Sequence, residues 1–206
     1  MELFHKNHFL ARKLHSLAGV IPVGLFLLEH MISNAEAVKG AAAYNGVIKF
    51  LQSVPFLPVV EILVIALPLY FHAIYGVFIL LQADNNVGSY SYGRNWMFFL
   101  QRVAGFIVLI FVTYHIFALR LASAFFGKEV SFAAMQAEVS NPLMFAFYAL
   151  GVISAAFHFT NGLYTFGIAW GITIGPKAQR VMQYVWGVLF ILMSVAGVSA
   201  LFAFVS

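Results

Sequence analysis

Four histidines lie inside long apolar stretches of the sequence, one in each of the first four stretches: His30, His72, His115 and His158. An ionisable side chain in a segment of this kind is costly to bury and is usually functional. Imidazole binds metal ions and haem iron through a ring nitrogen. A hydrogen bond to a neighbouring helix explains any single one equally well. Four histidines, one in each stretch, predict that they have a common function.

Positions along the stretches sort the histidines into two pairs. His30 lies 17 residues, and His115 lies 13 residues, after the basic residue before its stretch. At 1.5 Å per residue, both lie roughly 20–25 Å from one edge. His72 and His158 lie on stretches that run the opposite way, each twelve residues, or roughly 18 Å, before the end. We therefore expect an outer pair, His30 with His115, and an inner pair, His72 with His158, diagonally across a four-helix bundle.

Each pair of facing imidazoles could clamp a metal ion or a haem iron. Zinc or copper normally needs further ligands, and no Cys, Asp or His is spaced to supply them. A haem needs two axial ligands and room for a flat macrocycle. The chain has no cysteine, which excludes disulfides, iron–sulfur clusters and a covalent c-type haem with its C-x-x-C-H motif.

Small residues follow the histidine faces where a macrocycle would need room. Gly19 lies eleven residues, about three turns, before His30 and shares its face at the depth of the inner pair. Ala104, beside a glycine, has the same relation to His115. On the fourth stretch, small residues flank the histidine at spacings of three and four: Gly151, Ser154, Ala155, Gly162 and Thr165. Membrane helix packing also favours small residues. Aligned with four histidines, the pattern predicts two stacked, noncovalent b-type haems, each with two histidine ligands.

Polar residues at the ends of the stretches are candidates for proton transfer and for haem propionates. Glu61, eleven residues before His72, could give protons to a quinone near the outer pair. A glutamate at a helix start, where the helix dipole favours it, is an equal alternative. His15, Ser16 and Arg102 could contact propionates at the inner ends, although Arg102 could instead extend to the membrane surface and set the topology.

Five transmembrane helices must position these residues. The 206 residues are 63% apolar and 9% charged, with a mean hydropathy of +0.93. A soluble domain has about 45–50% apolar and about 25% charged residues. Continuous apolar runs exclude a membrane β-barrel, whose strands alternate. We expect one all-α membrane domain over residues 1–206, with its first four helices around the haems and with spans at about 14–35, 58–82, 97–122, 143–172 and 178–205.

The distribution of basic residues predicts the orientation. The net charge of +4 and the pI near 9.4 do not indicate a nucleic-acid partner, because the basic residues flank the apolar stretches. Seven Lys and Arg lie on the side of the N-terminus and four on the other side. This favours a cytoplasmic N-terminus and an external C-terminus in the cell membrane. A signal-peptide cleavage site at Ala35–Ala37 is the alternative for the first stretch, which is longer than a usual signal segment.

Several segments together resemble a known family. They are His15–Gly24 followed by Phe26–His30, Arg102–Gly105 leading to His115, and Phe157–Leu163 continuing to Trp170–Thr173. They resemble the membrane cytochrome b subunit of succinate dehydrogenase, in the single-chain, five-helix, two-haem form of Bacillus and its relatives. This form is related to the membrane anchor of menaquinol-dependent fumarate reductases, and the resemblance covers essentially the whole chain.

The resemblance implies a respiratory role linked to the tricarboxylic acid cycle. The chain would anchor a flavoprotein subunit and an iron–sulfur subunit, and succinate itself would react on another chain. Electrons from succinate would pass to an inner haem on His72 and His158, then to an outer haem on His30 and His115. A quinone, menaquinone, would accept them.

Two other classes of function remain open. A proton-coupled transporter could use the four histidines as a relay, although internal repeats or broken helices would be more typical of one. A structural anchor without a cofactor is the other, but it would not need one histidine on each of four helices. Red membranes are expected only if the chain binds haem.

Overall fold

The computed structural model describes residues 2–206, and their side chains from residue 8 onward. The structure is 85% helix, and the described residues contain no strand. Five of the described helical segments are long and apolar enough to cross a membrane: His8–Lys39, Leu57–Leu81, Gly93–Phe126, Pro142–Ala169 and Gly175–Val205. The expected all-α class with five membrane helices is confirmed.

Three of the five segments are composite helices. The first contains α1 (Glu2–Val20), α2 (Pro22–Ala35) and the 3₁₀ turn η1 (Glu36–Lys39). The second contains α4 (Leu57–Val60), the π-helical segment η2 (Glu61–Ala66) and α5 (Leu67–Leu81). The third contains α6 (Gly93–His115), the π-helical segment η3 (Ile116–Leu121) and α7 (Ala122–Phe126). The break between α1 and α2 falls before Pro22, which has no backbone N–H to continue the first helix.

The last two segments are the uninterrupted helices α9 (Pro142–Ala169) and α10 (Gly175–Val205). Asn141 caps α9 by accepting hydrogen bonds from the backbone N–H groups of Leu143 and Met144 at 2.8 and 3.4 Å. Gly171 and Gly175 adopt φ values of 71° and 83° in the turn to α10, a conformation that other residues rarely reach.

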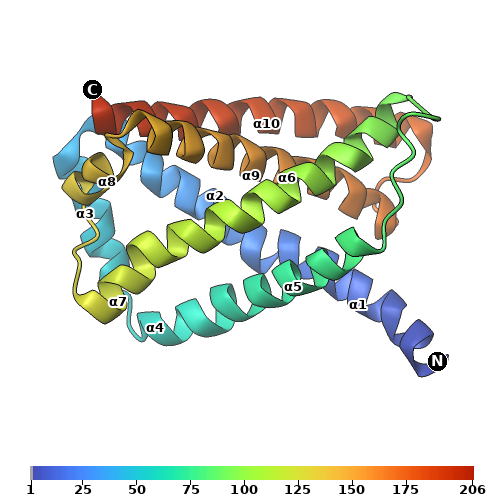
Figure 1. Cartoon of the computed structure of the whole chain (residues 1–206), viewed down its shortest axis with the longest axis horizontal. Helices are drawn as coiled ribbons and strands as arrows, with labels where there is room; N and C mark the ends of the chain where they lie inside the picture. Colours follow the sequence, from blue (N-terminus) through green and yellow to red (C-terminus); the bar gives the residue numbers. More distant parts are fainter. Residues whose placement is uncertain (1) are drawn as a thin grey trace.

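The helices pack as a bundle in which α9 is central. Helix α9 contacts α10, α6 and α1, while α1 also packs along α5 and α10 along α2. Figure 1 shows α6 crossing between α9 and α5, and α10 lying along the outside of the bundle. Helices α2, α5, α6 and α9 carry the four predicted ligands, one each, and α10 carries none.

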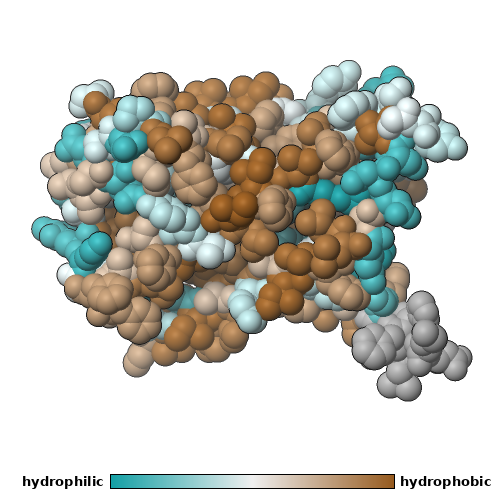
Figure 2. Space-filling view, in the orientation of Figure 1, coloured by the Kyte–Doolittle hydropathy of each residue, from teal (hydrophilic) through white to brown (hydrophobic). Residues whose placement is uncertain are grey.

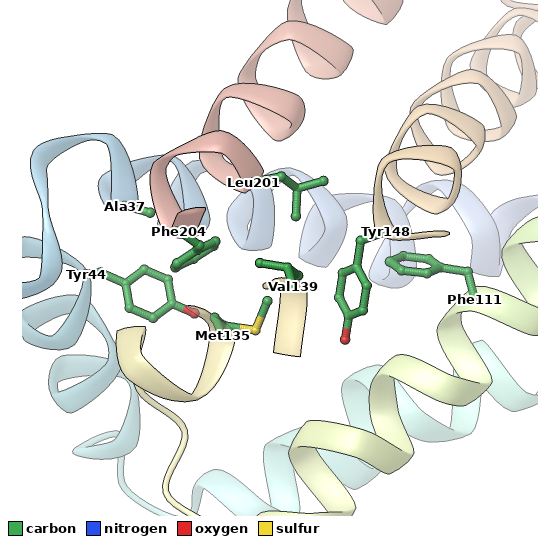
Figure 3. Packing of buried hydrophobic residues seen from close by; sticks show 8 residues of the cluster. All are labelled: Ala37, Tyr44, Phe111, Met135, Val139, Tyr148, Leu201 and Phe204. Atoms are coloured by element: carbon green, nitrogen blue, oxygen red, sulfur yellow. The ribbon is translucent and has the colours of Figure 1, made fainter. Parts of the chain in front are cut away.

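Two connecting helices close one end of the bundle. These are α3 (Ala41–Gln52) and α8 (Phe132–Val139), which lie near the C-terminus of α10. Their buried residues pack with those of the long helices in one cluster, drawn in Figure 3: Ala37, Tyr44, Phe111, Met135, Val139, Tyr148, Leu201 and Phe204. This cluster fixes the end of the bundle on which the outer histidine pair lies.

The exterior suits a lipid environment. Large apolar side chains along the membrane helices are exposed, among them Leu63 at 59% and Ile191 at 59%. Figure 2 shows apolar residues over the middle of the visible face and hydrophilic residues toward its two ends. Lipid contact makes such exposure favourable, so the low burial of these helices is expected.

Candidate functional site

The structure brings the four histidines together in two pairs. The rings of His30, on α2, and His115, at the end of α6, have centroids 5.7 Å apart with their planes at 80°. The rings of His72, on α5, and His158, on α9, have centroids 6.0 Å apart with their planes at 85°. Each pair therefore joins two different helices across the bundle.

The spacing within each pair fits a single metal ion between the rings. A bond from a metal to a histidine nitrogen is about 2.0–2.1 Å, so two imidazoles on one ion have ring centres roughly 6 Å apart. The described residues contain no group of three or more His, Cys, Asp or Glu that could hold a metal. Two histidines alone suit haem iron, because the macrocycle supplies the remaining ligands.

The rings of the inner pair contact the helix backbone beside two glycines. The Nδ1 of His72 lies 2.9 Å from the carbonyl oxygen of His15, and the Nδ1 of His158 lies 3.2 Å from that of Gln101. A Cβ at Gly19 would lie 2.7 Å from His72 Nδ1, and one at Gly105 would lie 2.9 Å from His158 Cε1. Only glycine lets the rings approach this closely. With Nδ1 bound to a carbonyl, Nε2 of each ring is left to bind a metal.

The outer pair has a different environment. Asn34 Nδ2 lies 3.3 Å from Nε2 of His30 and donates to the His30 carbonyl oxygen at 2.8 Å. The Nδ1 of His115 is buried and has no hydrogen-bond partner among the described residues. Phe111 and Tyr148 lie beside the His115 ring, with centroids at 5.5 and 5.8 Å. Aromatic packing, rather than a carbonyl contact, surrounds this histidine.

The small residues of α9 do not all face a cofactor space. A Cβ at Gly151 would lie 2.6 Å from Cδ1 of Phe111, so this glycine makes room for an aromatic ring of α6. Gly162 has the side-chain amide of Gln101 as its nearest neighbour, at 3.7 Å from a built Cβ. The expectation that the whole stripe lines a macrocycle therefore differs from the structure at Gly151, because Phe111 stands one turn before His115.

Glu61 forms an ion pair with Arg120. The guanidinium Nε lies 3.0 and 3.1 Å from the two carboxylate oxygens, and Nη2 lies 2.5 Å from Oε2. The two residues belong to η2 and η3, and such π-helical segments are frequent at functional sites. Arg120 is one of the four basic residues on the side opposite the N-terminus in the predicted topology. An opposite charge at the same depth as Glu61 was the available signal for this contact.

The three candidates for propionate contacts lie in different surroundings. His15 stacks on the inner-pair residue His72, with ring centroids 4.1 Å apart and planes at 6°. Ser16 accepts a hydrogen bond from Nε1 of Trp170 at 3.0 Å and donates to the Lys13 carbonyl oxygen at 2.9 Å. His15 therefore adjoins the inner pair directly, while Ser16 ties α1 to the end of α9.

Arg102 points toward the connection between α5 and α6. Its Nη1 donates to Oδ1 of Asn85 at 2.8 Å, and its guanidinium lies 3.6 Å from the ring centre of Phe98. This geometry agrees with a role at the membrane edge. Propionate binding by His15, Ser16 and Arg102 stays a prediction, and the side chain of the early histidine His5 lies outside the described residues.

Sequence reasoning missed two amides beside the inner pair. Gln101 lies on α6 and Asn161 on α9, and Asn161 is only 1% exposed. The Gln101 amide contacts His158, and Asn161 donates to Gln101. An amide within an otherwise apolar membrane helix was the available signal, because each such group needs a partner.

Comparisons with known proteins agree with this architecture. Residues 83–198, more than half of the chain, match the family model described as the succinate dehydrogenase/fumarate reductase transmembrane subunit. The succinate dehydrogenase cytochrome b558 subunit of Bacillus subtilis (strain 168) is 50% identical over 199 residues, which cover 97% of this chain and 98% of that protein. The paired histidines thus lie in a chain similar to a cytochrome over nearly its full length. The chain belongs to the family of membrane cytochrome b subunits of succinate dehydrogenase and fumarate reductase.

Proposed function

We propose that the chain binds two b-type haems, one on each histidine pair, and carries electrons between succinate dehydrogenase and a quinone. The observation that carries the proposal is the geometry of the two pairs, each with ring centres about 6 Å apart and no further protein ligand among the described residues. Haem supplies reversible one-electron chemistry at iron. His72 and His158 hold one haem and His30 and His115 hold the other, while the apolar helices around them exclude water.

The partners in this proposal are a flavoprotein subunit and an iron–sulfur subunit. They bind at the end of the bundle that carries the N-terminus, which is also the end nearer the inner pair. The excess of Lys and Arg on that side supports a cytoplasmic position for it and an external C-terminus. Lipid covers the exposed apolar faces of the helices. Family membership favours this electron-transfer role over a transporter with a histidine relay.

A difference spectrum with a haem count tests the proposal. Membranes containing the complete complex are oxidised, then reduced with succinate and finally with dithionite, and haem is extracted and counted per chain. We expect two noncovalent b haems, at least one of them reduced by succinate. Two haems that do not respond to succinate would contradict the proposed partners. A chain without haem would contradict the ligand assignment and would favour the transporter hypothesis.

The quinone is menaquinone in this proposal, and Glu61 is its proton donor near the outer pair. Arg120 holds the Glu61 carboxylate through both oxygens, so proton transfer requires the ion pair to loosen. Glu61 lies on η2 and Arg120 on η3, and rotation of either side chain is enough to loosen the ion pair. Menaquinone bound between the two segments would compete with Glu61 for the guanidinium.

We expect Glu61→Gln to slow quinone reduction about 10²-fold or more, because a general acid typically contributes 10²–10⁴-fold. Both haems should stay in place, since Glu61 contacts no histidine of either pair in the described structure. Succinate-dependent reduction of a quinone analogue measures the effect, and the haem spectrum serves as the control. Arg120→Gln tests the ion pair separately. Full turnover in Glu61→Gln would show that Glu61 is not the proton donor.

A further inference from the structure

The two histidines of the inner pair are supported in the same way by two different helices. Each ring places its Nδ1 near the carbonyl oxygen of a residue four positions before a glycine: His15 before Gly19 on α1, and Gln101 before Gly105 on α6. Four residues make about one helical turn, so the glycine lies beside that carbonyl on the helix surface. Because glycine has no Cβ, the histidine ring can reach the carbonyl oxygen. The carbonyl can only accept, which favours a proton on Nδ1 and leaves Nε2 for a metal.

Among the described residues, His158 is also supported by side-chain amides, and His72 is not. The side-chain amide of Gln101 donates from Nε2 to the His158 carbonyl oxygen at 3.0 Å, and the same nitrogen lies 3.2 Å from Nδ1. Asn161 Nδ2 donates to Oε1 of Gln101 at 2.7 Å and to the carbonyl oxygen of Met97 at 3.3 Å. Because both carbonyls can only accept, they fix the direction of both amides. We call Gln101 and Asn161 the amide pair.

The burial of Asn161 argues against a role in packing alone. Asn161 is 1% exposed, and its Oδ1 has no hydrogen-bond partner among the described residues. A buried, unsatisfied polar atom typically costs about 1–3 kcal/mol. An apolar side chain at this position would not carry this cost. The hydrogen bond that Asn161 Nδ2 donates to the side chain of Gln101 is therefore a better explanation for an asparagine at this position.

The outer pair provides an internal comparison. His115 is buried, but its Nδ1 has no partner among the described residues. His30 has the nearby amide of Asn34, which lies one turn further along the same helix and not on a facing one. No contact of the amide pair reaches either outer histidine in the described structure. An effect of the amide pair should thus be confined to the inner site.

We propose that Gln101 and Asn161 are positioning residues that hold His158 against the carbonyl of Gln101, with Nε2 directed at the inner haem iron. This inference rests on the proposed function. Asn161 orients the Gln101 side chain, Gln101 ties α6 to the α9 backbone at His158, and Gly105 lets the ring lie on α6. Together they set the orientation of one axial ligand and the strength of its hydrogen bond, and through these the inner haem's electronic properties.

Two leucine variants, one of the buried Asn161 and one of the half-buried Asn34, test the proposal as a pair. Asn161→Leu removes the amide beside the inner site, and Asn34→Leu removes the amide beside the outer site. Each variant is made in the complete complex, and low-spin ferric haem signals and midpoint potentials are measured by electron paramagnetic resonance during redox titration. The inner signal is assigned as the one that disappears in His158→Ala. These readouts do not depend on enzymatic turnover.

We expect Asn161→Leu to shift the signal of the inner haem. We also expect the affinity of the inner site for ferric haem, relative to its affinity for ferrous haem, to change about tenfold. A tenfold change equals 59 mV in the midpoint potential of a one-electron couple. The outer signal should stay in place. Asn34→Leu should give the reverse pattern. Asn161→Ser keeps a hydrogen-bond donor at this position and should shift the inner signal less than Asn161→Leu does, whereas a loss of packing alone predicts a shift at least as large.

Gln101→Met keeps the experiment decisive if Asn161→Leu fails to assemble. This change removes the amide contact to His158 itself, at a half-buried position, and leaves Asn161 in place. Unchanged inner signals in the variants of Gln101 and Asn161, or equal shifts of both signals, would overturn the proposal while two haems remain. Absence of both haems from the unmodified chain would instead contradict the proposed function.

Discussion

His158→Ala should remove the inner haem and leave the outer one. The His72 and His158 rings form one pair, and the outer pair lies on other parts of the bundle. An iron with one remaining histidine lacks the second axial ligand that a b-type haem of this kind requires. We expect the haem count to fall from two to one per chain, and reduction of the remaining haem by succinate to fall at least about 10²-fold.

The matching substitution His72→Ala should give the same spectrum, because both remove one ligand of the same site. His115→Ala provides the opposite case, in which the inner haem remains and is still reduced by succinate. Optical spectra with pyridine haemochrome counting measure all three variants. Loss of only the outer haem's absorbance from either inner variant would contradict the pairing. Chemical reduction with dithionite separates a missing haem from a haem that succinate no longer reaches.

Gly105→Ala should weaken haem binding at the inner site about 10–100-fold, the range typical of changes to groups that orient metal ligands. The new Cβ would lie 2.9 Å from Cε1 of His158, so the ring must move off the backbone of α6. Gly19→Ala should act likewise on His72. Alanine is the better helix former by about 1 kcal/mol, so a loss cannot come from weaker helix propensity.

Gly187→Ala is the matched control for these glycine variants. It lies on the membrane helix α10, and a Cβ built there meets nothing within 4 Å. Haem retention after dilution or detergent challenge measures the effect, with the outer haem in the same sample as an internal standard. Full retention of the inner haem in both Gly19→Ala and Gly105→Ala would show that close contact with the backbone is not required.

The amino-acid sequence already determines the class of the protein and the depth of its four central histidines. Apolar runs of membrane length predict five spans, and the rise per residue of a helix converts positions in the sequence into depths. The absence of cysteine and of further spaced ligands favours haem over another metal. These inferences succeed because they depend on distances along one helix, which are local quantities.

The tertiary structure decides what surrounds those histidines. Gln101 lies 57 residues from His158 and 60 residues from Asn161 in the sequence, and Glu61 pairs with Arg120 across 59 residues. Helical periodicity shows which residues share a face, but not how far each helix is rotated toward its neighbours. Packing sets that rotation, so Gly151 faces Phe111 while Gly105 faces His158. The fine positioning of the inner pair is therefore a property of the assembled bundle.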